Sequence, residues 1–232
     1  MEKLKILFED NHIVVVEKKP NIPSQSDKTG DMDMLTLVKQ YIKEKYQKPG
    51  NVYLGLVHRL DRPVGGVMIF AKTSKAASRL SNQVREKVFK KKYLAVVDGR
   101  FKEKEGSLED YLYKDERNNI SKVVNKDKKN AKFAKLDYKE LAYNEVKNLS
   151  LLEINLHTGR HHQIRVQLAN AGHSIFGDQK YGKRGQGKQI ALWAYELTIE
   201  HPTSKEMLTF KDLPEPIGTW CILKLDNKIY KK

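Results

Sequence analysis

Hydrophobic residues occur along the chain in short runs separated by polar segments, and these runs predict strands more often than helices. Val14, Val15 and Val16 have strong β propensity. The polar segment Asp10-Asn11-His12 separates them from a similar run before it, which is typical of a turn between two strands. The predicted strands are residues 5–9, 13–17, 66–72, 90–97, 108–113, 120–124, 133–138, 149–157 and 190–198.

Helical spacing of apolar residues is confined to a few segments. It occurs in residues 35–46, after a polar loop, and in residues 77–84, where Ser74 is a candidate N-cap. Because strands outnumber helices and do not alternate regularly with them, the pattern favours an α+β fold with a largely antiparallel mixed sheet, flanked by helices and loops. No repeat or clear linker interrupts the pattern, so we expect one elaborated domain over residues 1–232.

The net charge of the chain indicates what kind of partner the protein binds. Lysine and arginine total 44 against 29 aspartates and glutamates, a formal net charge of +15. This excess favours an anionic partner, nucleic acid above all. Apolar runs fall short of the ~20 residues of a membrane-spanning helix, and the first residues lack the features of a signal peptide. We therefore expect a cytoplasmic protein with no membrane contact.

The chain contains one cysteine, Cys221. A single cysteine excludes both a disulfide framework within the chain and a zinc site built from several thiolates. Its neighbours in the sequence are apolar and no histidine lies beside it, so we predict a buried packing residue rather than a nucleophile.

In the segment His58-Arg59-Leu60-Asp61-Arg62, one acidic residue is flanked by basic residues, and the segment lies between two apolar runs. Pro63 restricts φ after the acid, and Gly65 and Gly66 permit backbone angles or close approaches that a Cβ would forbid. A turn this stiff can hold Asp61 in place while the flanking strands support it. An isolated aspartate in a turn more often caps it or pairs with a neighbouring arginine, so this segment alone does not assign a function.

A second dense segment, residues 156–172, reads as a strand, a turn and a helix that ends at a glycine. Thr158 is a candidate N-cap of this helix. Ile164 begins a stripe of apolar residues at helical spacing, and Arg165 lies at the border of that stripe. From there its long side chain can reach a partly buried anion. We therefore expect Arg165 to pair with Asp61.

Three histidines of this segment, His157, His161 and His162, raise the alternative of a metal-dependent hydrolase. No H-E-x-x-H pattern is present, and the adjacent arginines would repel a dication. Caps and phosphate contacts explain these histidines more simply. A Ser-His-Asp hydrolase is disfavoured because the chain has no G-x-S-x-G turn. We expect no metal.

Three separated motifs, in order, resemble those of the RluA-type RNA pseudouridine synthases. They are the turn His58-Arg59-Leu60-Asp61, the strand segment Lys92-Tyr93-Leu94-Ala95, and the segment at residues 158–165, which reads TGRHHQIR. The resemblance spans residues 6–200 and is more specific than any one motif. It implies the catalytic fold of that family. Because the chain begins directly with predicted strands of this fold, we expect a single domain without the N-terminal S4-type RNA-binding domain that many relatives carry.

The resemblance also implies roles for individual residues. Asp61 resembles the catalytic acid that attacks or assists at the ribose C1′ of a target uridine. Tyr93 resembles the tyrosine that stacks on the base and takes part in proton removal, and Arg165 the cation paired with the aspartate. Ile164 resembles the apolar residue packed beneath the ring, and Arg59 the residue that enters the helix stack where the base has left.

The implied activity is the isomerisation of uridine to pseudouridine in a structured RNA, either rRNA or tRNA. His58, Arg62 and Arg160, basic residues of the same motifs, are expected to bind the substrate. The reaction has no net redox change and no group donor, so we expect no cofactor. We expect a monomer whose hairpins at residues 101–130 and basic loop at residues 182–188 select the RNA. The alternative from another class is an RNA-binding module that has lost turnover.

Overall fold

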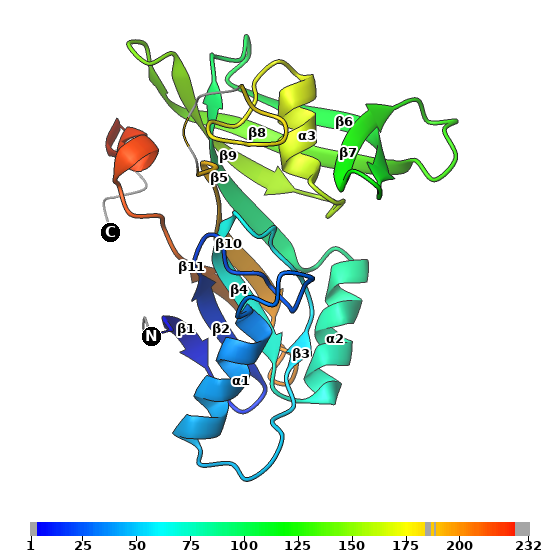
Figure 1. The fold of residues 1–232 in the computed structure, drawn as a ribbon, viewed down its shortest axis with the longest axis vertical. Helices are drawn as coiled ribbons and strands as arrows, with labels where there is room; N and C mark the ends of the chain where they lie inside the picture. Colours follow the sequence, from blue (N-terminus) through cyan, green and yellow to red (C-terminus); the bar gives the residue numbers. More distant parts are fainter. Residues whose placement is uncertain (1–3, 184–186, 188, 226–232) are drawn as a thin grey trace. The chain divides into compact units, whose positions relative to one another are not determined.

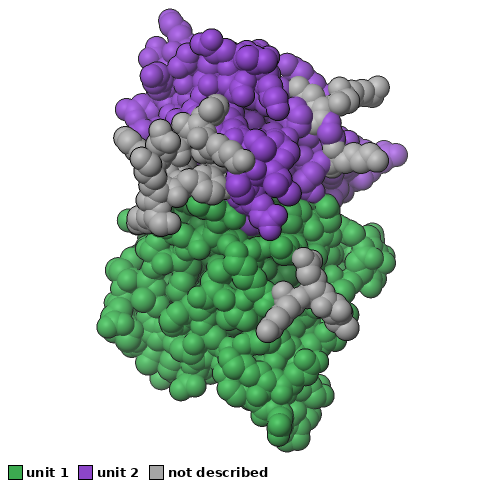
Figure 2. Space-filling model, turned by 90° about the vertical axis from the view of Figure 1, so that its left-hand side faces the viewer, with its two compact units in different colours: residues 1–91, 194–213 green, residues 92–193, 214–232 purple. Residues whose placement is uncertain are grey.

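The computed structural model describes residues 4–183, 187 and 189–225 (Figure 1). These form two compact units, which Figure 2 colours separately. Unit 1 comprises residues 1–91 and 194–213, and unit 2 comprises residues 92–193 and 214–232. Part of the expected basic loop, residues 184–186 and 188, lies outside the described residues. The expectation of one domain over the whole chain stays a prediction.

Unit 1 is built around two strands whose residues are all buried, as expected for apolar runs at the centre of a sheet. These strands pair antiparallel with each other, and further strands extend the sheet in the order β1-β2-β4-β10-β11. The elements are β1 (Ile6–Glu9), β2 (Ile13–Lys18), α1 (Met34–Lys45), β3 (Gly55–Leu56), β4 (Gly65–Ala71), α2 (Ser74–Arg85), β10 (Leu192–Glu200) and β11 (Met207–Lys211).

Both helices of unit 1 begin with a side-chain cap. The Asp33 carboxylate accepts the backbone N–H of Thr36 at 3.1 Å at the start of α1. At the start of α2 the cap is Thr73, whose Oγ1 accepts the N–H of Ala76 at 3.1 Å. The prediction of Ser74 as the cap was therefore wrong by one residue, because Thr73 already has the extended backbone that a cap requires.

Unit 2 is an antiparallel sheet in the order β5-β9-β8-β6-β7 with one helix on it (Figure 1). Leu112, Ala134 and Val166 form a small apolar cluster between the sheet and this helix. The elements are β5 (Lys90–Asp98), β6 (Glu105–Asp115), β7 (Ile120–Val124), β8 (Lys132–Asn144), β9 (Leu149–Leu156), α3 (Gln163–Asn170) and the 3-10 helix η1 (Gly218–Leu225). The described helices include none long and apolar enough to cross a membrane.

Two local predictions in unit 2 were wrong. Thr158 does not cap α3, because the helix starts only at Gln163, after His162 in a left-handed conformation. The Thr158 hydroxyl instead accepts the N–H of Lys135 at 2.9 Å and so ties the turn to β8. Cys221 is exposed rather than buried, because η1 turns Ile222 toward the protein and leaves the preceding thiol outside.

Candidate active site

Asp61 lies in the turn between β3 and β4 of unit 1, and the turn is closed by its own backbone. The N–H of Val64 donates to the carbonyl of Asp61 at 2.9 Å. The Asp61 side chain is half-buried, whereas Val64 is fully buried. The turn is therefore anchored in the core immediately after the carboxylate, as the sequence predicted for a stiff turn.

Lys18, at the end of β2, supports this turn from inside the protein. Its side chain has no exposed surface. The Nζ atom donates to the backbone carbonyls of Arg62 at 2.9 Å, Val64 at 2.6 Å and Lys19 at 3.1 Å. Burial lowers the pKa of Lys18 to about 7, against the attraction of the Asp61 carboxylate. A buried amine thus holds the backbone on the C-terminal side of the catalytic candidate.

Two residues of the polar segment after β2 hold the other parts of the turn. The Ser24 hydroxyl donates to the carbonyl of Leu60 at 2.8 Å and accepts the N–H of the same residue at 3.1 Å. The N–H of Asn21 donates to the carbonyl of Arg62 at 2.8 Å. Neither Lys18 nor Ser24 was predicted from the sequence to hold this turn. A lysine at the end of a strongly apolar strand, two residues after Val16, was the available signal for the first of them.

Gly66 follows the turn and cannot carry a side chain. Its φ of +122° lies in the region that L residues rarely adopt, and a Cβ built there would come within 2.2 Å of the carbonyl oxygen of Ala194. The backbone of β10 therefore approaches β4 directly beside the turn. The expectation that a glycine permits a close approach here is confirmed.

The basic residues around Asp61 differ in their surroundings. The His58 Nε2 accepts the N–H of Ile69 at 3.1 Å, and its ring lies 5.2 Å from that of Phe89. Burial, with the Lys91 charge adding to it, lowers the pKa of His58 to about 3, so the ring is neutral. Arg59 and Arg62 are exposed, and the Arg62 guanidinium contacts the Asp31 carboxylate. Substrate binding by these residues stays a prediction.

Arg165 lies in unit 2, where its guanidinium pairs with the carboxylate of Asp178. Its Nε and Nη2 atoms each donate to an oxygen of the Asp178 carboxylate at 2.7 Å. Both side chains are almost completely buried. The ring of Tyr181 lies 5.3 Å from the guanidinium carbon. A bidentate pair of this kind fixes the orientation of the guanidinium.

Asp178 was not predicted from the sequence to be a site residue, although it stands in a Gly-Asp…Tyr-Gly turn. Its Oδ1 also accepts the N–H groups of Lys180 and Tyr181, at 2.8 and 3.2 Å, so one carboxylate organises both the turn and the arginine. Pairing of Asp61 with Arg165 stays a prediction.

Tyr93 and Ile164, the two expected ring contacts, are buried residues of unit 2. Tyr93 lies opposite Ile154 in the β5–β9 register, and Ile154 lies opposite Tyr138. Residues directly opposite in antiparallel strands share a face. Tyr138 also shares a face with Ala134, four residues earlier on β8, which packs against Val166 of α3. Tyr93 therefore points to the side of the sheet that carries α3. Arg160 is exposed, and its Nε donates to the carbonyl of Phe133 at 2.9 Å.

Two buried glutamines of α3 fix the helix on the sheet. Gln163 donates to the carbonyl of Lys135 at 3.1 Å and to the side-chain oxygen of Gln167 at 2.9 Å. Gln167 in turn donates to the Asp110 carboxylate at 2.8 Å. These amides leave Arg165, which lies between them in the sequence, with little freedom to move.

The three histidines of the metal alternative do not form one cluster. His157 contacts the Asp137 carboxylate on the sheet. His161 and His162 stack with ring centroids 3.7 Å apart, and the His162 Nδ1 lies 2.9 Å from the Tyr181 hydroxyl. Among the residues that the structure describes, no group of three or more His, Cys, Asp or Glu side chains could hold a metal ion. The metal-dependent hydrolase thus gains no support.

Comparison with known sequences decides the family. A family profile described as RNA pseudouridylate synthase matches residues 12–170, which include the Asp61 turn, Tyr93 and Arg165. The chain belongs to the RluA-type RNA pseudouridine synthases. It is 33% identical to an uncharacterized RNA pseudouridine synthase of Bacillus subtilis, named YhcT, over 89% of this chain and 67% of the relative. It is 32% identical to the dual-specificity RNA pseudouridine synthase RluA of Escherichia coli O157:H7, over 90% of this chain and 92% of the relative.

Solved structures support the fold of this RluA-type chain. The human protein called RNA pseudouridylate synthase domain containing 1 matches with a TM-score of 0.74 at 24% identity, covering 93% of this chain and 84% of its own. The human domain containing 4 protein matches with a TM-score of 0.75 at 22% identity, covering 91% and 89%. The α+β prediction is confirmed.

Proposed function

We propose that this RluA-type synthase isomerises specific uridines of a structured RNA, rRNA or tRNA, with Asp61 as the catalytic acid. The observation that carries this assignment is the way Asp61 is held. Its turn is closed by the Val64 N–H and supported from below by the buried amine of Lys18. The carboxylate is half-buried at the end of this rigid turn. A group that must meet a sugar carbon in one orientation needs such a support.

The proposed chemistry breaks the bond between uracil N1 and the ribose C1′ and forms a new bond from uracil C5 to the same carbon. The base turns between these two steps. C5 then loses its proton and N1 gains one, so atoms and charge balance without an external donor. Asp61 attacks or assists at C1′, and Tyr93 stacks on the base and takes part in removing the C5 proton. Ile164 packs beneath the ring.

The charge state of the carboxylate explains why an arginine belongs to the proposal. A carboxylate that assists at the sugar must stay ionised in a partly dry pocket, and a nearby opposite charge stabilises the ionised form. Arg165 supplies that charge in the proposal. The Asp178 carboxylate, which accepts two hydrogen bonds from the guanidinium, supports the role by holding it in one orientation.

The target base must leave its stack before Asp61 can reach the sugar. Extruding a base costs a few kcal/mol, which an inserted side chain and an aromatic platform partly offset. Arg59, exposed beside Asp61, is the proposed inserted residue. His58, Arg62 and Arg160 complete the proposed substrate contacts. A relative named as a ribosomal large subunit pseudouridine synthase supports rRNA as a candidate target, and tRNA is the second candidate.

The test is the Asp61→Asn variant, incubated with unmodified rRNA and tRNA transcripts. We expect no pseudouridine by chemical mapping, while RNA affinity stays within about twofold because phosphate contacts supply most of the binding energy. Glu44→Gln, which neutralises an exposed carboxylate of α1, is the matched control and should keep full turnover. Retained product with Asp61→Asn would refute the assignment. A wild-type protein that binds but modifies no transcript would favour the RNA-binding module without turnover.

A further inference from the structure

Aromatic side chains gather on one face of the unit 2 sheet, near the loop between β7 and β8. Tyr111 of β6 lies directly opposite Phe133 of β8 in the antiparallel register. The two rings meet edge to face with centroids 5.7 Å apart. Tyr113 lies on the same face, because side chains two residues apart on a strand point to one side. Its partner across the β6–β7 pair is Lys122.

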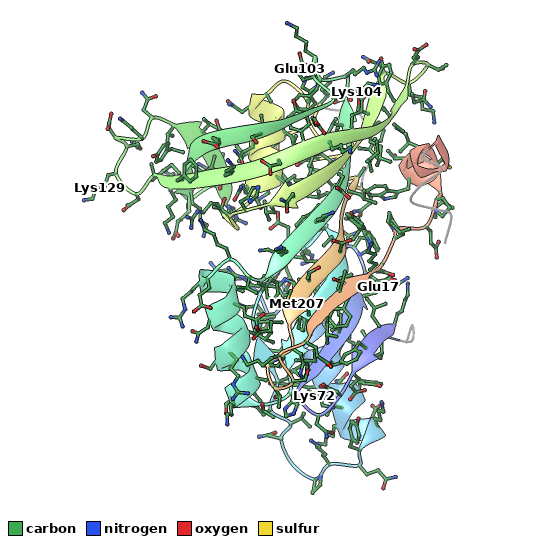
Figure 3. The ribbon with its side chains drawn as sticks, turned by 180° about the vertical axis from the view of Figure 1, so that it is seen from behind. Glu17, Lys72, Glu103, Lys104, Lys129 and Met207 are labelled. Carbon is green, nitrogen blue, oxygen red and sulfur yellow. The ribbon has the colours of Figure 1, made fainter. Side chains whose placement is uncertain are left out.

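This face is the one that α3 does not cover. Leu112 and Ala134, which alternate with the aromatic residues along β6 and β8, pack against Val166 of α3. Their neighbours in the sequence therefore point away from the helix. Figure 3 views unit 2 from this side, with β6 and β8 in front of α3. Phe133 is 39% exposed, a large fraction for a phenylalanine in a strand.

Positive charge lies near these rings. The Nζ atom of Lys128 lies 5.5 Å from the centroid of the Tyr113 ring. Residues 111–133 contain seven lysines and arginines and three acids, a local charge of +4. One of the acids, Asp115, contacts Lys122 at 3.7 Å. Lys129 stands at the tip of the β7–β8 loop in Figure 3. Rings and cations thus share one surface.

We propose that this aromatic–lysine face (Tyr111, Tyr113, Lys122, Lys128 and Phe133) binds a single-stranded segment of the RNA substrate. Aromatic rings stack on unpaired bases of any sequence, and lysines beside them neutralise the phosphates. A duplex offers no base faces to such rings, since its bases stack on one another. A neutral protein partner would leave the local charge of +4 without a counterpart. The inference rests on the proposed function in that RNA is the substrate.

The position of Arg160 connects this face to the motif that carries the family resemblance. Arg160 belongs to the segment at residues 158–165, and its Nε donates to the backbone carbonyl of Phe133 at 2.9 Å. One exposed cation therefore connects the strand segment that carries Phe133 with the turn before α3. A strand of RNA that leaves the proposed Arg160 contact would meet the rings next.

The test measures binding of a fluorescent oligouridylate of about twelve nucleotides, and of a blunt RNA duplex of the same length, by anisotropy. We expect the Tyr113→Ser/Phe133→Ser double variant to bind the oligouridylate at least about tenfold more weakly, because stacking on two bases is lost. Binding of the duplex should stay within about twofold. Tyr113→Phe keeps the ring and should bind both probes as the wild type does.

A charge control separates this face from general attraction. Lys128→Gln should weaken oligouridylate binding and reduce its salt dependence, whereas Lys147→Gln, an exposed lysine in the turn at the other end of β8, should do neither. Equal effects of the two lysines, or a double variant that binds the oligouridylate within twofold of wild type, would overturn the proposal. The proposal would also be overturned if the double variant had a wild-type circular dichroism spectrum and lost equal affinity for the oligouridylate and for the duplex.

Ultraviolet crosslinking of the wild-type protein to the oligouridylate gives a second measurement if the double variant fails to fold. Crosslinked peptides within residues 111–133 support the proposal, and crosslinks confined to other segments contradict it. Because each of these experiments measures RNA binding and not turnover, they can distinguish failure of this proposal from failure of the isomerase assignment. In that event Asp61→Asn and wild type would both leave transcripts unmodified while the aromatic variants still lose the oligouridylate.

Discussion

The buried amine of Lys18 leads to the most detailed prediction. In Lys18→Met, the side chain keeps a similar length but donates no hydrogen bond. The carbonyl of Val64, which accepts from Lys18 at 2.6 Å, then loses this buried donor. Leaving a buried acceptor unpaired costs about 1–3 kcal/mol, and each ordinary hydrogen bond that the Lys18 amine donates contributes about 0.5–1.5 kcal/mol. We expect the variant to unfold with about 2–4 kcal/mol less free energy near pH 8.

The sign of the pH dependence follows from the pKa of Lys18, which is about 7 in the folded protein and 10.5 in a free side chain. Between these values the unfolded chain binds more protons than the folded one. The stability of the wild type therefore rises with pH across this window, by up to about 1.4 kcal/mol per pH unit. The Met variant lacks this contribution, so the difference in unfolding free energy should grow by about 2 kcal/mol from about pH 7.5 to 9.

Urea denaturation of both proteins across this pH range measures the difference. Lys5→Met is the control with the opposite sign. Burial opposes the charge of Lys5, but hydrogen bonds to Asp212 and Glu17 outweigh it and raise the pKa of Lys5 to about 12. Its contribution is present below pH 10.5 and is lost as the pH rises through about 12, so it should stay constant from about pH 7.5 to 9. A Lys18 difference that stays constant or shrinks there would refute the reasoning.

Three further predictions concern residues that hold the site. Asp178→Asn removes the buried carboxylate that accepts two hydrogen bonds from the Arg165 guanidinium, so urea denaturation should show a loss of about 3–5 kcal/mol. A loss below about 1 kcal/mol would contradict a buried, bidentate pair. Gly66→Ala should destabilise the protein far more than Gly30→Ala. Both glycines have positive φ, but only at Gly66 would a Cβ overlap with backbone atoms. Equal shifts of the thermal unfolding midpoint in the two variants would contradict this overlap. The pKa of His58 is about 3 in the folded protein, below that of a free histidine, so the free energy of unfolding should fall as the pH drops from about 6.5 to 3. His58→Gln should flatten this dependence on pH. An unchanged slope in the variant would show that protonation of His58 does not contribute to it.

Much of the fold could be predicted from local patterns. The runs around Val14 and Ile69 became β2 and β4, and the spacing from Leu35 to Tyr46 became α1. Such patterns succeed because period-two and period-3.6 alternation reflects which side of an element is buried. The caps at Ser74 and Thr158 failed because a cap depends on the backbone angles of one residue, which the neighbouring turn sets.

The sequence by itself determined the family and the identity of the motif residues, because the order and spacing of the Asp61, Tyr93 and Arg165 motifs can be read without a structure. The tertiary structure alone decided what holds them. Asp178 pairs with Arg165 across thirteen positions of sequence, and Lys18 reaches the turn from forty-odd positions away. The physical reason is burial: once a charged side chain is removed from water, its stability depends on whichever donor or acceptor the packing of distant segments brings beside it.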